Sequence, residues 1–185
     1  MPHPNILDRS KAALVIVDVQ EAFRSSIPEF AELAGTISTA VRGCRILDVP
    51  VIVTEQYPKG LGRTAEEILL VLDDGFEPLV KTAFSSCGAA GFVDALSAIE
   101  VEQIVLCGLE THVCVNQTAH DLIDRGFQVH LLADAVASRS ETNKEIGLRK
   151  MFLSGIVPSS VEMMFFELMR DAKHEQFKEI QKLIR

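Results

Sequence analysis

Three side chains with complementary chemistry follow short apolar runs in this sequence. Asp18, Lys81 and Cys114 supply a carboxylate, an ammonium and a thiol, and each lies at or just past a run that predicts a buried strand. The carboxyl ends of parallel strands share one edge of a sheet, where such folds place their sites. A carboxylate can take a thiol proton and pass it to a leaving amine, while a nearby ammonium would keep that carboxylate ionised. Together the three residues predict covalent catalysis by a cysteine nucleophile.

The position of Cys114 strengthens this prediction. An apolar run ends at Gly108, a polar turn follows, and the next segment has the spacing of an amphipathic helix. Its apolar face comprises Val115, Ala119, Leu122 and Ile123. Thr111 is a candidate N-cap, which places Cys114 in the first helical turn. Unpaired N–H groups and the helix dipole favour a thiolate there, and the same N–H groups could stabilise an oxyanion.

The other three cysteines have weaker claims to catalysis. Cys44 lies on the apolar face of its predicted helix and is expected in the core. Cys107 ends a buried strand and is expected to be inert. Cys87 follows Lys81 closely and could line the site, but a structural role is favoured.

Alternating strands and helices position these residues. The predicted strands cover residues 13–17, 51–53, 79–81, 103–107, 128–132 and 161–165. The predicted helices cover 28–47, 65–72, 91–98, 113–125 and 143–154, with a last one from near 174, and residues 56–63 form a Gly/Pro-containing loop. This order predicts an α/β fold with a mostly parallel sheet and helices on both faces. No linker interrupts it, so residues 1–185 are expected to form one domain.

Composition limits the class of protein further. The 185 residues carry a net charge of -8, which argues against nucleic-acid binding because that function needs a basic face. No apolar run approaches the ~20 residues of a membrane span. An export signal is not recognisable, so a cytoplasmic protein is expected. Four cysteines in this length do not indicate a disulfide framework.

Three segments resemble the signature segments of the isochorismatase-like cysteine hydrolases. They are residues 14–23, 81–85 and 108–115, and their order and separation match. The resemblance implies a three-layer Rossmann-like α/β/α fold with a six-stranded parallel sheet, and a triad of Asp18, Lys81 and Cys114. It also implies a cis peptide bond between Leu109 and Glu110. An oxyanion hole would then form from the N–H groups of Glu110, or its neighbour, and of Cys114.

Departures from the family pattern narrow the chemistry. Nicotinamidases carry an Asp-x-His metal motif after the second strand, whereas residues 54–58 here contain no histidine. The five histidines have no metal-ligand spacing either, so we expect neither a metal nor another cofactor. Members that act on isochorismate do not need the cysteine, and its presence favours cleavage of a small amide or related C–N bond. The predicted substrate pocket comprises Gln20, Phe23, Tyr57 and His112, although an ordinary turn explains the 56–63 loop equally well.

Other functions fit the sequence less well. A dinucleotide site needs a glycine-rich turn where residues 18–21 have none, and a Cys-x5-Arg phosphatase needs an arginine where His120 stands. A receiver domain does not explain Cys114. A hydrolase-like scaffold that binds a small molecule or a partner without turnover stays open. The Met- and Phe-rich run 161–169 and the family resemblance both indicate a homo-oligomer, with neither nucleic acid nor membrane as a partner.

Overall fold

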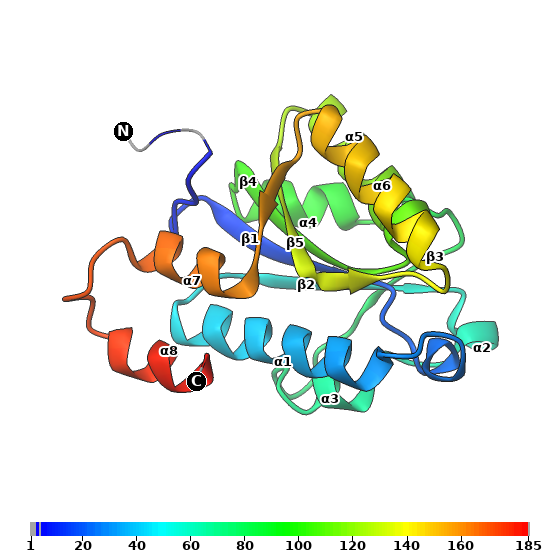
Figure 1. Cartoon of the computed structure of the whole chain (residues 1–185), viewed down its shortest axis with the longest axis horizontal. Helices are drawn as coiled ribbons and strands as arrows, with labels where there is room; N and C mark the ends of the chain where they lie inside the picture. The colour runs from blue at the N-terminus through cyan, green and yellow to red at the C-terminus, as the bar shows by residue number, and fades with distance from the viewer. Residues whose placement is uncertain (1–2, 4, 185) are drawn as a thin grey trace.

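A six-stranded sheet with every strand pair parallel forms the centre of the computed structural model, which describes residues 3 and 5–184 (Figure 1). The strand order is β3-β2-β1-β4-β5-β6. The strands are β1 (Ala12–Val17), β2 (Val51–Gln56), β3 (Leu79–Lys81), β4 (Gln103–Leu109), β5 (Gln128–Ala137) and β6 (Val157–Ser159). The first strand therefore lies in the middle of the sheet, and the chain winds outward from it in both directions. The predicted α/β class with a parallel sheet is confirmed.

Helices cover both faces of this sheet, which makes the three predicted layers (Figure 1). One face carries α1 (Phe30–Ile46), α3 (Glu66–Leu69), α7 (Val161–Met169) and α8 (Phe177–Leu183). The other carries α4 (Phe92–Ala98), α5 (Asn116–Asp124) and α6 (Glu141–Leu153). The shorter helical segments are η1 (Glu21–Ser25), α2 (Pro58–Leu61), η2 (Ser86–Gly88) and a single π-helical turn η3 (Thr111–Val115).

Strand β1 has a continuous apolar sequence because it lies in the centre of the sheet. Leu14 and Ile16 of β1 join the core beneath α1, whereas Val15 and Val17 join the core beneath α4 and α5. Every residue of β1 is buried. A strand with helices on both faces has no solvated side, so it shows no alternation of polar and apolar residues.

The segment predicted as the sixth strand is a helix, and this prediction was wrong. Residues 161–169 form α7, and the strand β6 comes earlier, at Val157–Ser159. The buried residues of α7 recur at helical spacing, at Val161, Met164, Phe165, Leu168 and Met169. Ser160 caps the helix by accepting a hydrogen bond from the Met163 N–H at 3.2 Å. The apolar richness of this run serves packing against α1, where the Phe165 ring lies directly over Gly43.

Within the described residues, none of the helices combines the length and the apolar character that crossing a membrane requires.

Candidate active site

The register of the sheet brings the ends of three strands to one level. Val17 of β1 pairs with Thr54 of β2 on one side and with Gly108 of β4 on the other. Strand β2 runs two residues further, where Gln56 pairs with Lys81 of β3. The residues that follow these ends therefore meet at the carboxyl edge of the sheet, as the sequence predicted.

The chain turns sharply at this edge. Asp18 has a φ of 51°, in the left-handed region that few residues other than glycine adopt. Gly108 on the neighbouring strand has a φ of 119°, and a Cβ there would overlap the carbonyl oxygen of Val17. Asp18 directly follows β1, whereas Gly108 lies within β4, beside a register shift in the pairing of β4 with β5. The missing side chain of Gly108 lets β4 pass close to the end of β1, so that Asp18 and the residues after β4 lie near each other.

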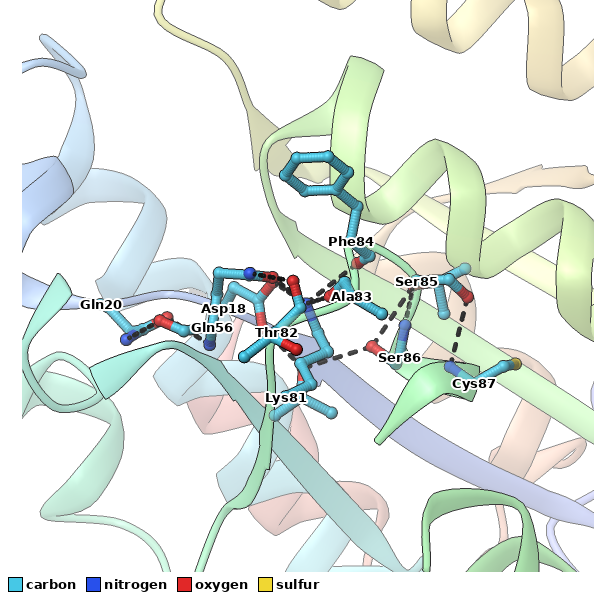
Figure 2. A network of polar contacts seen from close by, with 12 residues as sticks. Asp18, Gln20, Gln56, Lys81, Thr82, Ala83, Phe84, Ser85, Ser86 and Cys87 are labelled. Carbon is cyan, nitrogen blue, oxygen red and sulfur yellow. Dashed lines mark hydrogen bonds and ion pairs between the residues drawn. The ribbon is translucent and has the colours of Figure 1, made fainter. Parts of the chain in front are cut away.

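Asp18 and Lys81 form a buried ion pair. The Lys81 Nζ lies 2.5 Å from Asp18 Oδ2. The side chain of Lys81 is 0% exposed and that of Asp18 is 1% exposed. The same ammonium contacts three further oxygens, those of the Gln56 side chain (2.8 Å), the Ala83 carbonyl (3.1 Å) and the Phe84 carbonyl (2.9 Å). Figure 2 shows these groups converging on the lysine, while the Phe84 ring points away from them. An ammonium has three hydrogens, so Lys81 has no donor left over for a ligand.

The thiol of Cys114 lies beside this pair, close enough to interact with the Asp18 carboxyl group. Burial is the main cause that raises the pKa of Cys114, to about 12, and the Asp18 charge raises it further against the influence of Lys81. Burial therefore favours the thiol, opposite to the thiolate that the position at a helix terminus was predicted to favour. A helix dipole contributes about 0.3–1 kcal/mol, less than one pKa unit, so it cannot offset this burial.

Burial also acts on the carboxyl group. It raises the pKa of Asp18 above its ordinary value, although Lys81 and Thr54 both favour the ionised form. A carboxylate with a raised pKa is a better proton acceptor than one in water. The site thus places a thiol next to a carboxylate that an ammonium holds in place.

The nucleophile turn differs from the family expectation in one detail. All peptide bonds among the described residues are trans, so the expected cis bond between Leu109 and Glu110 is wrong. Glu110 instead takes an extended conformation (φ -83°, ψ 141°) and is the N-cap residue of η3, a position predicted for Thr111. Its carbonyl accepts hydrogen bonds from the N–H groups of Val113 (3.0 Å) and Val115 (3.2 Å), which close the wide π-helical turn in the trans form. The turn places Cys114 within its first five residues, as predicted.

The Glu110 side chain ties this turn to the loop before α6. Its Oε1 accepts hydrogen bonds from both the backbone N–H and the Nε of Arg139, each at 3.0 Å. Burial opposes ionisation of Glu110, but the bonds from Arg139 outweigh it and lower the pKa. His112 reaches the same loop, with its Nδ1 3.0 Å from the Ser138 Oγ. These contacts fix the conformation of the turn that presents Cys114.

The four predicted pocket residues lie in different surroundings. Gln20 is fully buried, and its side-chain amide forms hydrogen bonds with backbone groups of Gln56 and Gly62. It therefore stabilises the surrounding loops and does not face a ligand. Phe23 is partly buried against the core on the α1 side. Tyr57 is 54% exposed beyond the end of β2. His112 is half-buried, two residues before Cys114 in the chain.

The remaining cysteines lie apart from the triad. Cys44 and Cys107 are fully buried, and burial raises the pKa of both thiols, that of Cys44 to about 12. Cys87 is partly exposed, and its sulfur points away from Asp18 (Figure 2).

Four polar residues lie around the triad that the sequence did not predict as site residues. Thr54 donates to Asp18 Oδ1 at 2.8 Å, and Gln56 holds Lys81. Ser86 and Thr118 extend this network away from Asp18. The signal for Thr54 was a lone hydroxyl at the end of the apolar strand 51–53. Ser86 and Thr118 gave no signal, because their contacts are set by tertiary packing.

Other candidate sites in the described part of the chain would be a metal cluster or a surface hollow. Among the described residues, no group of three or more His, Cys, Asp and Glu side chains could hold a metal ion. A surface hollow of about 910 Å³ lies at the opposite edge of the sheet, near Gln103, Arg125 and Gln128. It contains none of the three triad residues, so the carboxyl edge is the better candidate.

Comparisons with known proteins point to one family. The model of the isochorismatase domain matches residues 12–163. Isochorismatase domain-containing protein 2 of Danio rerio is 40% identical over 178 residues, covering 96% of this chain and 89% of the relative. A structure described as MAR1 ribonuclease from Caenorhabditis elegans is 39% identical, with a TM-score of 0.91 over 97% of this chain and 92% of that one. The Escherichia coli YcaC gene product, described as an octameric hydrolase of unknown specificity, shares the fold at 21% identity, with a TM-score of 0.84 over 100% of this chain and 96% of that one.

Proposed function

Since this chain belongs to the isochorismatase family, whose fold is that of a hydrolase, we propose that it is a cysteine hydrolase that cleaves a small amide or related C–N bond. One observation carries the proposal. A thiol, a carboxylate and an ammonium, all at least nine-tenths buried, meet at the carboxyl edge of the sheet, where the thiol lies next to the carboxylate. A site that merely bound a ligand would have no need to bury this pair of charges beside a thiol.

The first half of the reaction forms a thioester. Asp18 accepts the proton of Cys114 as the sulfur attacks the carbonyl carbon of the substrate. The C–O π electrons move to oxygen, and we propose that the N–H groups of Cys114 and of Glu110 or its neighbour stabilise that oxyanion. The C–N bond then breaks, and Asp18 returns its proton to the departing nitrogen. The amine or ammonia leaves with the acyl group still attached to Cys114.

The second half regenerates the thiol. Asp18, again ionised, takes a proton from water as the water oxygen attacks the thioester. The C–S bond breaks, the carboxylic acid leaves, and Asp18 protonates the sulfur. Lys81 acts through its charge and its hold on Asp18, because its hydrogens are already engaged by four protein oxygens.

The test is turnover of a panel of small amides by the wild type and by Cys114→Ala. The wild type should release amine or ammonia and should gain the mass of an acyl group on Cys114 in acid-quenched samples. Cys114→Ala should fold and lose at least about 10³-fold in rate, because a covalent route without its nucleophile is closed. Cys87→Ala is the matched control and should retain activity, since its sulfur points away from Asp18.

Two outcomes would contradict the proposal. Full turnover by Cys114→Ala would show that Cys114 is not the nucleophile. A wild type that binds amides without any turnover would show that the protein is a binding protein and not an enzyme for amides. Because one solved relative is described as a ribonuclease, the panel should include RNA. We expect no cleavage of it, since a chain of net charge -8 repels a polyanion.

We also propose that the protein is a homo-oligomer. Met163 and Phe166 of α7 are 49% and 43% exposed and line a hollow of about 360 Å³ on the surface. Large apolar side chains at such positions are common at interfaces between subunits. The octamer described for the Escherichia coli protein of the same fold is consistent with this proposal.

A further inference from the structure

Three buried hydroxyl groups connect Asp18 to the helix that follows the nucleophile. Thr54, Ser86 and Thr118 are each 0% exposed. Thr54 Oγ1 lies 2.8 Å from Asp18 Oδ1, Ser86 Oγ lies 3.3 Å from Thr54 Oγ1, and Thr118 Oγ1 lies 3.3 Å from Ser86 Oγ. The Ser86 N–H also donates to Thr118 Oγ1 at 2.8 Å. Strand β2, segment η2 and helix α5 are thereby linked to one carboxylate.

The hydrogen atoms of these hydroxyls can be placed by counting. An ionised carboxylate only accepts, so the single hydroxyl hydrogen of Thr54 goes to Asp18. The contact between Thr54 and Ser86 must then use the hydrogen of Ser86, and the contact between Ser86 and Thr118 must use that of Thr118. All three O–H groups therefore point toward Asp18, and each polarises the next in the same sense.

This arrangement depends on the charge of Asp18. A donor to a carboxylate stabilises the ionised form, and it must turn or lose its bond when that oxygen is protonated. Lys81 holds Oδ2, and Thr54 holds Oδ1. We infer that Thr54, supported by Ser86 and Thr118, is a positioning residue that keeps Asp18 ionised and correctly oriented to accept the thiol proton. The inference rests on the proposed function of Asp18 as the base.

The contact lengths rank the three hydroxyls. The Thr54–Asp18 bond has the ordinary length of a strong O–H···O bond, whereas the 3.3 Å contacts of Ser86 are longer than that range. Thr54 should therefore have the largest effect on Asp18, and Ser86 and Thr118 should act mainly by orienting Thr54. Lys81 and Cys114 are the titratable groups that face Asp18. Both residues are still present in variants of these hydroxyls.

The test is the pH dependence of Cys114 alkylation, which needs no substrate. Iodoacetamide labelling of Cys114 is measured by peptide mass spectrometry between about pH 4 and 9, a range that spans the ordinary pKa of a carboxyl group and its raised values. The acidic limb of the rate reports protonation of Asp18. Thr54→Val removes the donor but keeps a β-branched side chain suited to a strand. We expect its acidic midpoint to rise by about one to two pH units, the effect of one hydrogen bond to a charged group.

Two further variants separate positioning from a structural effect. Thr54→Ser restores the hydroxyl and should return the midpoint to the wild-type value. Ser86→Ala should raise it by less than Thr54→Val does. If Thr54→Val has the same midpoint as the wild type and only a lower melting temperature, Thr54 has a structural role. That result would overturn this inference but leave the proposed function of Asp18 standing. A wild type with no acidic limb would overturn both this inference and the assignment of Asp18 as the base.

Discussion

Removing Lys81 should make the stability of this protein depend on pH in a way that identifies Asp18. In Lys81→Met the Asp18 carboxyl group stays buried but loses its counter-ion, with Thr54 as its one remaining strong donor. Breaking a buried pair by removing one partner costs about 3–5 kcal/mol, because the other charge is left uncompensated. Both side chains are essentially fully buried, so solvent screening does not reduce this figure.

The sign of the pH dependence follows from the pKa of Asp18. Burial already raises it in the wild type, and loss of Lys81 should raise it further, because the ammonium is the charge that favours the ionised form. Between the unfolded value near ~4 and this raised value, the folded state binds more protons than the unfolded state. The free energy of unfolding of Lys81→Met should therefore fall as pH rises through that window. Its deficit relative to the wild type should be small near about pH 5 and largest near about pH 8–9.

Urea unfolding of three proteins at about pH 5 and about pH 8.5 measures this deficit. The double variant Asp18→Asn with Lys81→Met has no charge at either position of the pair, so it should recover about half or more of the stability lost at the higher pH. Recovery should be incomplete, because the Gln56, Ala83 and Phe84 oxygens still lack the lysine donor. An equal deficit of Lys81→Met at both pH values, or no recovery in the double variant, would refute the account of the pair.

Two other predictions concern the scaffold. Gly108→Ala should destabilise the protein by about 3 kcal/mol or more, because a Cβ at this position, with a φ of 119°, would overlap the Val17 carbonyl oxygen. Gly75→Ala is the control: it is also at positive φ but in open space, so it should cost only about 1–2 kcal/mol. Equal losses of stability in thermal unfolding would contradict the steric argument. If the protein is the homo-oligomer that we propose, Met163→Glu combined with Phe166→Glu should lower its mass in light scattering toward that of a monomer, with little loss of helical signal. An unchanged mass would place the interface elsewhere.

The sequence predicted best what burial on both faces determines. Strands β1 and β3 and helix α1 lie within two residues of their predicted bounds, because continuous apolar runs and helical spacing are strong local signals. The convergence of Asp18, Lys81 and Cys114 followed from one rule about parallel sheets. That rule needs only the strand ends, which these runs define.

The sequence predicted less well what depends on spatial neighbours. The 161–169 run was too apolar for its helical period to stand out from a strand. The protonation of Cys114 depends on burial under the surrounding helices, which a helix-terminus argument does not contain. The bracing role of Gln20 depends on Gln56 and Gly62, which lie 36 and 42 residues away along the chain. Such contacts leave no periodic trace in a sequence.

The left-handed backbone of Asp18 has a consequence for how this site can be lost during evolution. At a φ of 51° most side chains strain the backbone by about 1–2 kcal/mol, whereas glycine and asparagine are tolerated best besides aspartate. A lineage released from selection for catalysis should therefore drift to asparagine or glycine here before other residues. Descendants that carry Asp18→Asn or Asp18→Gly would keep the turn and the fold while losing the base that we propose. The residue at this one position would then distinguish working enzymes from relatives that have become binding proteins.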